Sequence, residues 1–273
     1  MRIETSKRVT YEHNPLAEVI CQVQFTKLQD LSDGDKTAIR QALSDIGYTS
    51  CAEEVSFGFS QQIVINGPPS PQAPPIAFPQ SRLQHFTTQD NLWRVSISTE
   101  FFALTCLKYV GWDQFLPRML AAIQLFVEIW ATVTPTRLGL RYKDVIEREP
   151  LGLSDVPWHE LIRPFLLGPL APGALADGQT AKEAEVENFL SQTSLQLEHA
   201  RLLLQSSLLA SIDGQRRAFL IDADFSNEEN LESELLAKPA ILKARLERLH
   251  ASAGDLFRRG ITERLHHALR PSN

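Results

Sequence analysis

The chain has 273 residues, a formal net charge of -6 at pH 7, and 43% hydrophobic and 22% charged residues. This composition is ordinary for a soluble protein, so it does not indicate nucleic-acid binding overall. The sequence contains no run of about 18 apolar residues, the length that a membrane span needs. The N-terminal residues also lack the apolar stretch of a secretory signal. We therefore expect a cytoplasmic protein that makes no membrane contact.

The three cysteines, Cys21, Cys51 and Cys106, show neither a CxxC pair nor the spacing of a metal site. Two of them lie in apolar strand patterns, which favours inert, buried thiols. The expected compartment is therefore reducing, in agreement with a cytoplasmic location.

The first predicted element is a strand at 16–25, where apolar residues alternate with mostly polar ones. Ser32 or Asp33 then fits the N-cap of a helix that ends near Gly47. A second strand is predicted from 54 to 65.

Residues 67–80 contain too many prolines for a helix or a central strand, so they predict an extended surface loop. Short apolar segments at 82–87, 92–99 and 101–109 then follow one another closely. This spacing indicates an antiparallel meander of three strands.

The segment 112–132 is the clearest helix, because its large apolar residues recur at helical spacing and form a wide stripe. The stripe consists of Trp112, Phe115, Leu116, Met119, Leu120, Ile123, Phe126, Val127 and Trp130. Pro117 fits only if the regular helix begins just before it, so that the missing N–H belongs to the first turn. Pro135 ends the helical pattern, and the next strand begins directly after it.

Regularity is weaker in the second half. Residues 180–192 predict a polar helix, and 193–211 predict one long strand whose inside-outside phase slips near Ala200. The Asp-Gly pair at 213–214 is a strong hairpin signal before a strand at 217–225. The pattern indicates a second sheet region.

A last amphipathic helix is predicted from Pro239 to about Phe257. Gly260 and Thr262 are expected to break it and to cap a final short turn. Each half of the chain thus has strands followed by one long helix, a pattern typical of a distant internal duplication.

We predict an α+β fold with two lobes of mainly antiparallel sheet, each covered by a long amphipathic helix. The N-terminal lobe would span 1–135 and the C-terminal lobe 136–273, with tight packing between them. A parallel doubly wound sheet is disfavoured, because the strands within 82–109 follow one another without crossover helices. The alternative is one large curved sheet that holds the helices around a pocket.

The most informative strand is 136–146, with the sequence TRLGLRYKDVI. Because side chains alternate along a strand, Arg137, Arg141 and Lys143 fall on one face, opposite the apolar residues. Glu18, on the polar side of the first strand, is a candidate neighbour. These four residues are the candidate ligand- or partner-binding set.

Two interpretations of the cationic face stay open. In the first, Glu18 pairs with Arg141 and solvent covers the rest, which makes the strand structural. In the second, the face forms a groove that binds phosphate, carboxylate or an acidic partner segment, for which the planar guanidinium group is well suited.

Acidic residues of the second half support an enzymatic alternative. Asp222 and Asp224 share one face of the strand at 217–225, and Glu198 is predicted on the neighbouring strand. Carboxylates so placed can bind Mg²⁺ or Mn²⁺, which activate water or stabilise phosphoryl charge. The competing interpretation is an ordinary solvated strand face, with no cofactor.

Common catalytic motifs are absent from the sequence. It contains no GxSxG, HExxH, GxxxxGKS or GxGxxG pattern, so the usual fingerprints of hydrolases, zinc peptidases and nucleotide-binding proteins are missing. His199 adjoins Glu198, but neighbours on a strand face opposite sides.

Several segments together resemble a known family. They are NPLAEVICQVQF at 14–25, RLQHFTTQDNLWRVSISTEFFAL followed by YVGWDQF, TRLGLRYKDVI, FLIDADF, and LHASAGDLFRRGITERL near the end. In this order they resemble the TIGR-type family of sporadically distributed prokaryotic proteins, with the RxGxRY core as the most recognisable piece. The resemblance covers nearly the whole chain and implies no catalytic residues.

The patchy distribution of that family resembles that of genes in mobile defence or toxin-linked clusters, which favours an interaction protein. We therefore expect a noncatalytic binding or accessory protein with a protein partner or an anionic ligand. A metal-dependent hydrolase or nuclease is the second hypothesis, and a small anionic ligand-binding protein is the third. The oligomeric state is left open.

Overall fold

The computed structural model describes residues 3, 8–26, 32–56, 81–130, 133–210, 216–229, 231, 235–236 and 238–272. The strands are β1 (Thr10–Tyr11), β2 (Leu16–Phe25), β3 (Ser50–Ser56), β4 (Ser81–Thr87), β5 (Trp93–Ile97), β6 (Phe101–Cys106), β7 (Pro135–Glu147), β8 (Phe189–Gln196), β9 (Arg201–Ala210), β10 (Arg217–Asn227) and β11 (Pro271–Ser272). The α-helices are α1 (Asp33–Asp45), α2 (Trp112–Ile129), α3 (Pro164–Leu167), α4 (Pro239–Gly260) and α5 (Glu263–Ala268). The predicted loop at 67–80, the predicted turn at 213–214 and residues 57–65 of the strand predicted at 54–65 lie outside the described residues.

One antiparallel sheet dominates the fold. It has nine strands in the order β3-β4-β5-β6-β2-β7-β10-β9-β8, and every described neighbour pair is antiparallel. The α+β class is therefore confirmed. The sheet does not break at residue 135, because β7 pairs with β2 from Leu16 opposite Asp144 to Phe25 opposite Pro135. The two halves share a single sheet, as in the alternative drawn from the sequence.

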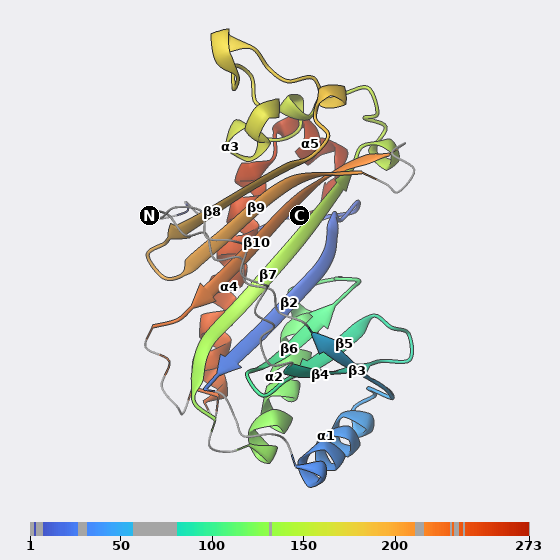
Figure 1. Cartoon of the computed structure of the whole chain (residues 1–273), viewed down its shortest axis with the longest axis vertical. Coiled ribbons are helices and arrows are strands. Elements are labelled where there is room, and N and C mark those ends of the chain that lie inside the picture. Colours follow the sequence, from blue (N-terminus) through green and yellow to red (C-terminus); the bar gives the residue numbers. More distant parts are fainter. Residues whose placement is uncertain are drawn as a thin grey trace, which may run out of the picture.

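The two halves place their strands in the same order (Figure 1). Each half begins with a strand at the centre of the sheet, β2 or β7. The chain then passes through helical segments to the outer edge and returns inward strand by strand, ending on β6 beside β2 or on β10 beside β7. A long helix, α2 or α4, closes each half.

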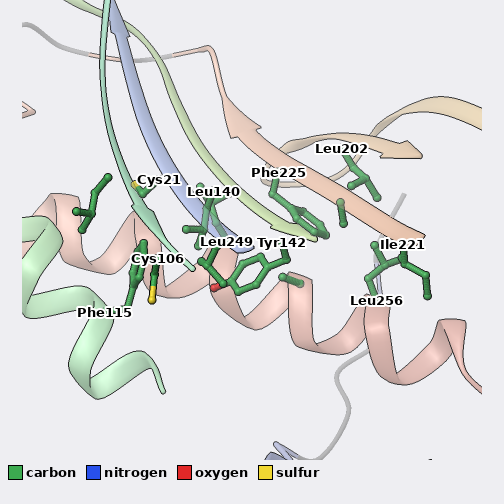
Figure 2. Close-up of a cluster of buried hydrophobic side chains, with 14 of the residues drawn as sticks. Cys21, Cys106, Phe115, Leu140, Tyr142, Leu202, Ile221, Phe225, Leu249 and Leu256 are labelled. Atoms are coloured by element: carbon green, nitrogen blue, oxygen red, sulfur yellow. The ribbon is translucent and has the colours of Figure 1, made fainter. Parts of the chain in front are cut away.

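The apolar core lies between the sheet and these two helices. Helix α2 contacts β6, helix α4 contacts β7 and β10, and the two helices contact each other. Figure 2 shows side chains of the sheet, among them Leu140, Tyr142 and Phe225, facing Leu249 and Leu256 of α4. All of these side chains are buried. Burial of this area supplies most of the stabilisation of such a fold.

Helix α2 buries the predicted stripe. Phe115, Met119, Ile123 and Phe126 are at most 4% exposed, and the remaining stripe residues are buried or pack partly buried against the core. Pro117 lies inside the helix, deeper than the predicted first-turn position, because the helix already begins at Trp112. The lost N–H hydrogen bond is therefore a local cost that the buried stripe offsets.

Strand alternation gives the sheet a second, polar face. The helices α2, α3 and α4 contact the sheet on the core side, and in Figure 1 the two long helices lie behind it. We call the other side the open sheet face. Its charged and amide residues include Glu18, Gln22, Gln24, Arg94, Arg137, Arg141, Lys143, Glu147, Gln192, Gln196, Arg201, Gln205, Asp222 and Asp224.

Two predictions in the second half were wrong. Residues 193–211 are not one strand, because β8 and β9 form a hairpin whose turn lies at Glu198 and His199. The N–H of Leu197 donates to the carbonyl of Ala200 at 2.8 Å, and both of these side chains are buried. The phase slip near Ala200 is thus a chain reversal.

Residues 180–192 do not form the predicted polar helix. A single 3-10 turn, Glu183–Glu185, is followed by β8 from Phe189. Residues 189–192 of the predicted helix instead pair with β9 as the first half of β8, so strand pairing outweighs the local helical pattern there.

Candidate binding site on the open sheet face

Arg141 and Asp222 form the best-defined ion pair of the open sheet face. The guanidinium Nε donates to Oδ1 at 2.7 Å and Nη2 donates to Oδ2 at 2.5 Å. Asp222 is opposite Lys143 in the register of β7 and β10, so Arg141 reaches it along the diagonal. This bidentate bond raises the pKa of Arg141 further above its usual range, and it fixes the plane of the guanidinium group.

Glu18 holds two other cations. Its Oε2 accepts a hydrogen bond from Lys143 Nζ at 2.5 Å, and its Oε1 lies 3.4 Å from Arg94 Nη2. The predicted Glu18–Arg141 pair does not form, because Glu18 lies opposite Lys143 and Ile20 lies opposite Arg141. A shift of two residues in register therefore changes which cation the glutamate neutralises.

Arg137 lies along its own strand above Gly139. A Cβ atom built on Gly139 would be 2.2 Å from Arg137 Nη1, so only glycine leaves room for this conformation. The extended side chain reaches Asp224, with Nη2 2.7 Å from Oδ1, and also lies 3.8 Å from Glu228. Its Nη1 lies 3.4 Å from the Gln22 side-chain oxygen. The Arg137 guanidinium is therefore enclosed by side chains of the same chain.

The cations and acids of these pairs differ in exposure. The side chains of Asp222, Glu18 and Asp224 are 5, 16 and 19% exposed, whereas those of Arg141 and Arg94 are 36 and 35% exposed. Lys143 is 28% exposed. The acids thus lie beneath the cations, and the outermost charge of this part of the face is positive.

Arg137 is the exception among the cations. Only 16% of its side chain is exposed, and three groups contact its guanidinium. For Arg137 the geometry agrees with the structural interpretation of the cationic strand. Arg141 and Lys143 are paired but remain accessible.

The acids proposed as a metal site are not brought together. Asp222 and Asp224 share the open sheet face, but each accepts hydrogen bonds from an arginine. Glu198 lies in the β8–β9 turn, 3.5 Å from His199, because the predicted strand is a hairpin. Across the described ranges, no group of three histidine, cysteine or acidic side chains is arranged to hold a metal ion. The residues present therefore do not fit the Mg²⁺ or Mn²⁺ site.

Sequence reasoning missed Arg94 and Asp144. Arg94 is on β5 and reaches Glu18 across β6, a contact that depends on strand order. Asp144 is 5% exposed on the core side of β7, and burial, followed by the charge of Asp222, raises its pKa to about 8. The sequence signal for Asp144 was its position among the apolar residues on one face of an alternating strand.

Comparisons with known proteins add little. No family model and no curated protein matches the chain. Among solved structures, S. pombe Pct1 RNA triphosphatase in complex with the Spt5 CTD aligns over 97% of this chain and 88% of its own, with 7% sequence identity and a TM-score of 0.16. At this TM-score the alignment carries no argument. In the part of the chain that the structure describes, no helix is long and apolar enough to cross a membrane.

Proposed function

We propose that this protein is a noncatalytic binding protein that captures an acidic segment of a partner protein on its open sheet face. The observation that carries the proposal is the layered arrangement of charge, in which shielded carboxylates lie under accessible cations. Arg94, Arg141 and Lys143 are the residues that would contact the partner.

The hydrogen-bond pattern leaves donors for such a partner. Asp222 engages Nε and Nη2 of Arg141, and the contacts of the described residues leave Nη1 unengaged. Lys143 donates one hydrogen bond to Glu18, although an ammonium group has three donors. The carboxylates hold the cations in place, which lowers the side-chain entropy lost on binding.

The spacing of the cations favours an extended ligand. Arg94 and Arg141 lie in one row of the sheet, joined through Thr105 and Ile20 on the two strands between them. Three strand spacings of about 4.8 Å separate them, or about 14 Å in all. One small anion cannot bridge that distance, whereas successive carboxylates of an acidic segment can. A small anion at Arg141 alone is the competing outcome.

A titration of a labelled oligo-glutamate peptide by fluorescence anisotropy tests the proposal. The wild type is compared with Arg141→Gln/Lys143→Gln, which removes two accessible cations and keeps Asp222 and Glu18. The matched control is Lys243→Gln/Arg248→Gln on α4, which makes the same charge change at exposed positions on the helix side. Circular dichroism and thermal melts establish that each variant is folded.

We expect the double variant on the open face to bind at least ten-fold more weakly and the α4 control to bind like wild type. Binding should also weaken as salt rises, since the contacts are between accessible charges. Equal losses in both variants would mean that net charge, not this face, attracts the peptide. Inorganic phosphate that binds wild type as well as the peptide does would favour the small-anion alternative.

From the sequence we also propose a cytoplasmic location and membership of the TIGR-type family of sporadically distributed proteins. We further propose that two lobes, 1–135 and 136–273, descend from one repeated unit. The shared strand order of the two halves supports the duplication. An accessory role beside mobile defence or toxin-linked genes agrees with a protein that captures a partner.

A further inference from the structure

Strand β8 forms an edge of the sheet and carries none of the usual protection. Its sequence, FLSQTSLQ, has no charged residue and no proline. Its pairing with β9 runs over eight residues, from Phe189 opposite Leu208 to Gln196 opposite Arg201, without a bulge. Edge strands are normally blunted by charges, prolines, bulges or short length, because their unpaired N–H and C=O groups attract another strand.

The outer side of β8 is accessible. Among the described strands it pairs with β9 alone. Gln192, Thr193 and Ser194 are exposed, and Leu190 on the open sheet face is 64% exposed. Among the described residues, the Phe189 end is covered, where its ring lies against Gly168 of the preceding 3-10 turn (Gly168–Leu170).

The opposite edge of the sheet differs in sequence. Strand β3 includes Glu53 and Glu54 among its seven residues. Charges on an edge strand oppose pairing with a second copy of the same strand, because like charges would meet. Of the two edges, β8 is the one suited to self-association.

We propose that β8 pairs antiparallel with β8 of a second copy of this chain, about a two-fold axis that passes by Gln192 perpendicular to the sheet. An axis in this direction keeps both helix-covered sides on the same face of the joined sheet. The proposal is independent of the open-face ligand, since it uses the strand edge and not the cations.

The register with Gln192 on the axis matches like with like on the core side. There Phe189 would lie opposite Leu195 of the second copy, and Ser191 opposite Thr193. On the open face Gln192 would lie opposite its own equivalent and Leu190 opposite Ser194. Both apolar residues of the core side then meet an apolar partner, and the hydroxyl groups meet each other. Self-complementarity of this kind is what a two-fold interface requires.

The first test is the mass of the full chain in solution, measured by analytical ultracentrifugation. We expect a two-chain mass for wild type and a one-chain mass for Gln192→Lys, which brings two ammonium groups together on the axis. The matched control is Gln179→Lys at an exposed loop position, which should stay dimeric. Mixing Gln192→Lys with Gln192→Glu should restore the dimer, because opposite charges then meet.

The second test fixes the register by disulfide formation. Directly opposed residues of an antiparallel pair have Cα atoms about 4.5 to 5.5 Å apart, within the range that a disulfide spans. In a Cys51→Ser background, which removes the exposed native thiol, Gln192→Cys should form a covalent dimer on oxidation. Thr193→Cys, one residue off the axis, should do so far less.

Three results would overturn the proposal. They are a monomeric wild type, a dimer that Gln192→Lys leaves intact, and crosslinking that is equal at 192 and 193. A monomer whose β8 amide signals change on adding an extended foreign peptide would also contradict it, and would assign the edge to a heterologous partner instead.

Discussion

The phenolic oxygen of Tyr142 lies 2.7 Å from Nδ1 of His250, which joins the central strand β7 to helix α4 beneath the sheet. The imidazole also stacks on Trp112 at the start of α2, with ring centroids 4.2 Å apart and planes within 6°. His250, a residue of α4, therefore contacts both the central strand β7 and helix α2. Burial, and to a lesser degree the charge of Arg8, lowers the pKa of His250 to about 4.

This contact predicts a loss of stability in mild acid. The pKa of His250 in the folded protein is below the ordinary value of about 6.5, so the unfolded chain takes up the proton first. The contribution is complete above pH 6.5 and is lost as the pH falls toward 4. The loss should be at most about 3 kcal/mol, since one pKa unit corresponds to about 1.4 kcal/mol.

The measurement is urea unfolding of wild type and His250→Gln between pH 7 and 4. The stability difference between the two proteins should shrink or reverse as the pH falls, because glutamine does not titrate. A constant difference over this range would contradict the assignment.

Asp144 predicts the opposite dependence on pH. Its pKa of about 8 lies above the ordinary value of about 4, so the folded state retains a proton that the unfolded chain loses, and stability declines from about pH 4 to 8 and levels off above pH 8. Asp144→Asn should therefore melt higher than wild type at pH 9 and lose most of that advantage near pH 5. Asp155→Asn, at an exposed loop position, serves as the control and should show no such trend. Melting temperatures of the three proteins measured from pH 5 to 9 test this prediction.

Phe126→Ala tests the core between α2 and the sheet. The ring is 4% exposed and lies 5.1 Å from the ring centroid of Phe25 and 5.3 Å from that of Phe102. We expect a loss of about 3 to 5 kcal/mol from the lost transfer and cavity terms. Gln124→Ala, at an exposed position of the same helix, should cost little by comparison. An unchanged melting temperature for Phe126→Ala would place this helix face outside the core.

Gly139→Ala tests the path of Arg137. The new methyl group would occupy the position of the guanidinium, so the Arg137–Asp224 bond should break and stability should fall. In an Arg137→Gln background the same substitution should cost less, because the obstructed group is gone. A double-mutant cycle by urea unfolding measures this coupling. Additive effects would show that the two residues do not interact.

The parts of the fold that rest on local periodicity were predictable. The segment 112–132 matches α2, because its apolar residues recur over many turns, and the inward face of 16–25 is buried as expected. The hairpin turn at Glu198 and His199 was not predictable, since it contains no glycine, asparagine or proline to mark it.

The candidate site was predictable only one strand at a time. Alternation places Arg137, Arg141 and Lys143 on one face, and the register confirms it. Their partners depend on which strands are neighbours and on registers two residues apart, neither of which is encoded within one strand. Arg137 is more enclosed than the accessible Arg141 and lies over Gly139, a contact that is seen only with the side chains in place.

The most direct test of the binding account is the NMR signal of the arginine side chains. The guanidinium Nε–H of Arg141 is held by Asp222 and that of Arg137 lies near Glu228, so both should give observable signals. On addition of oligo-glutamate, we predict a shift of the Arg141 signal and no shift of the Arg137 signal. A titration in which the Arg141 signal stays fixed while the peptide binds would contradict the account.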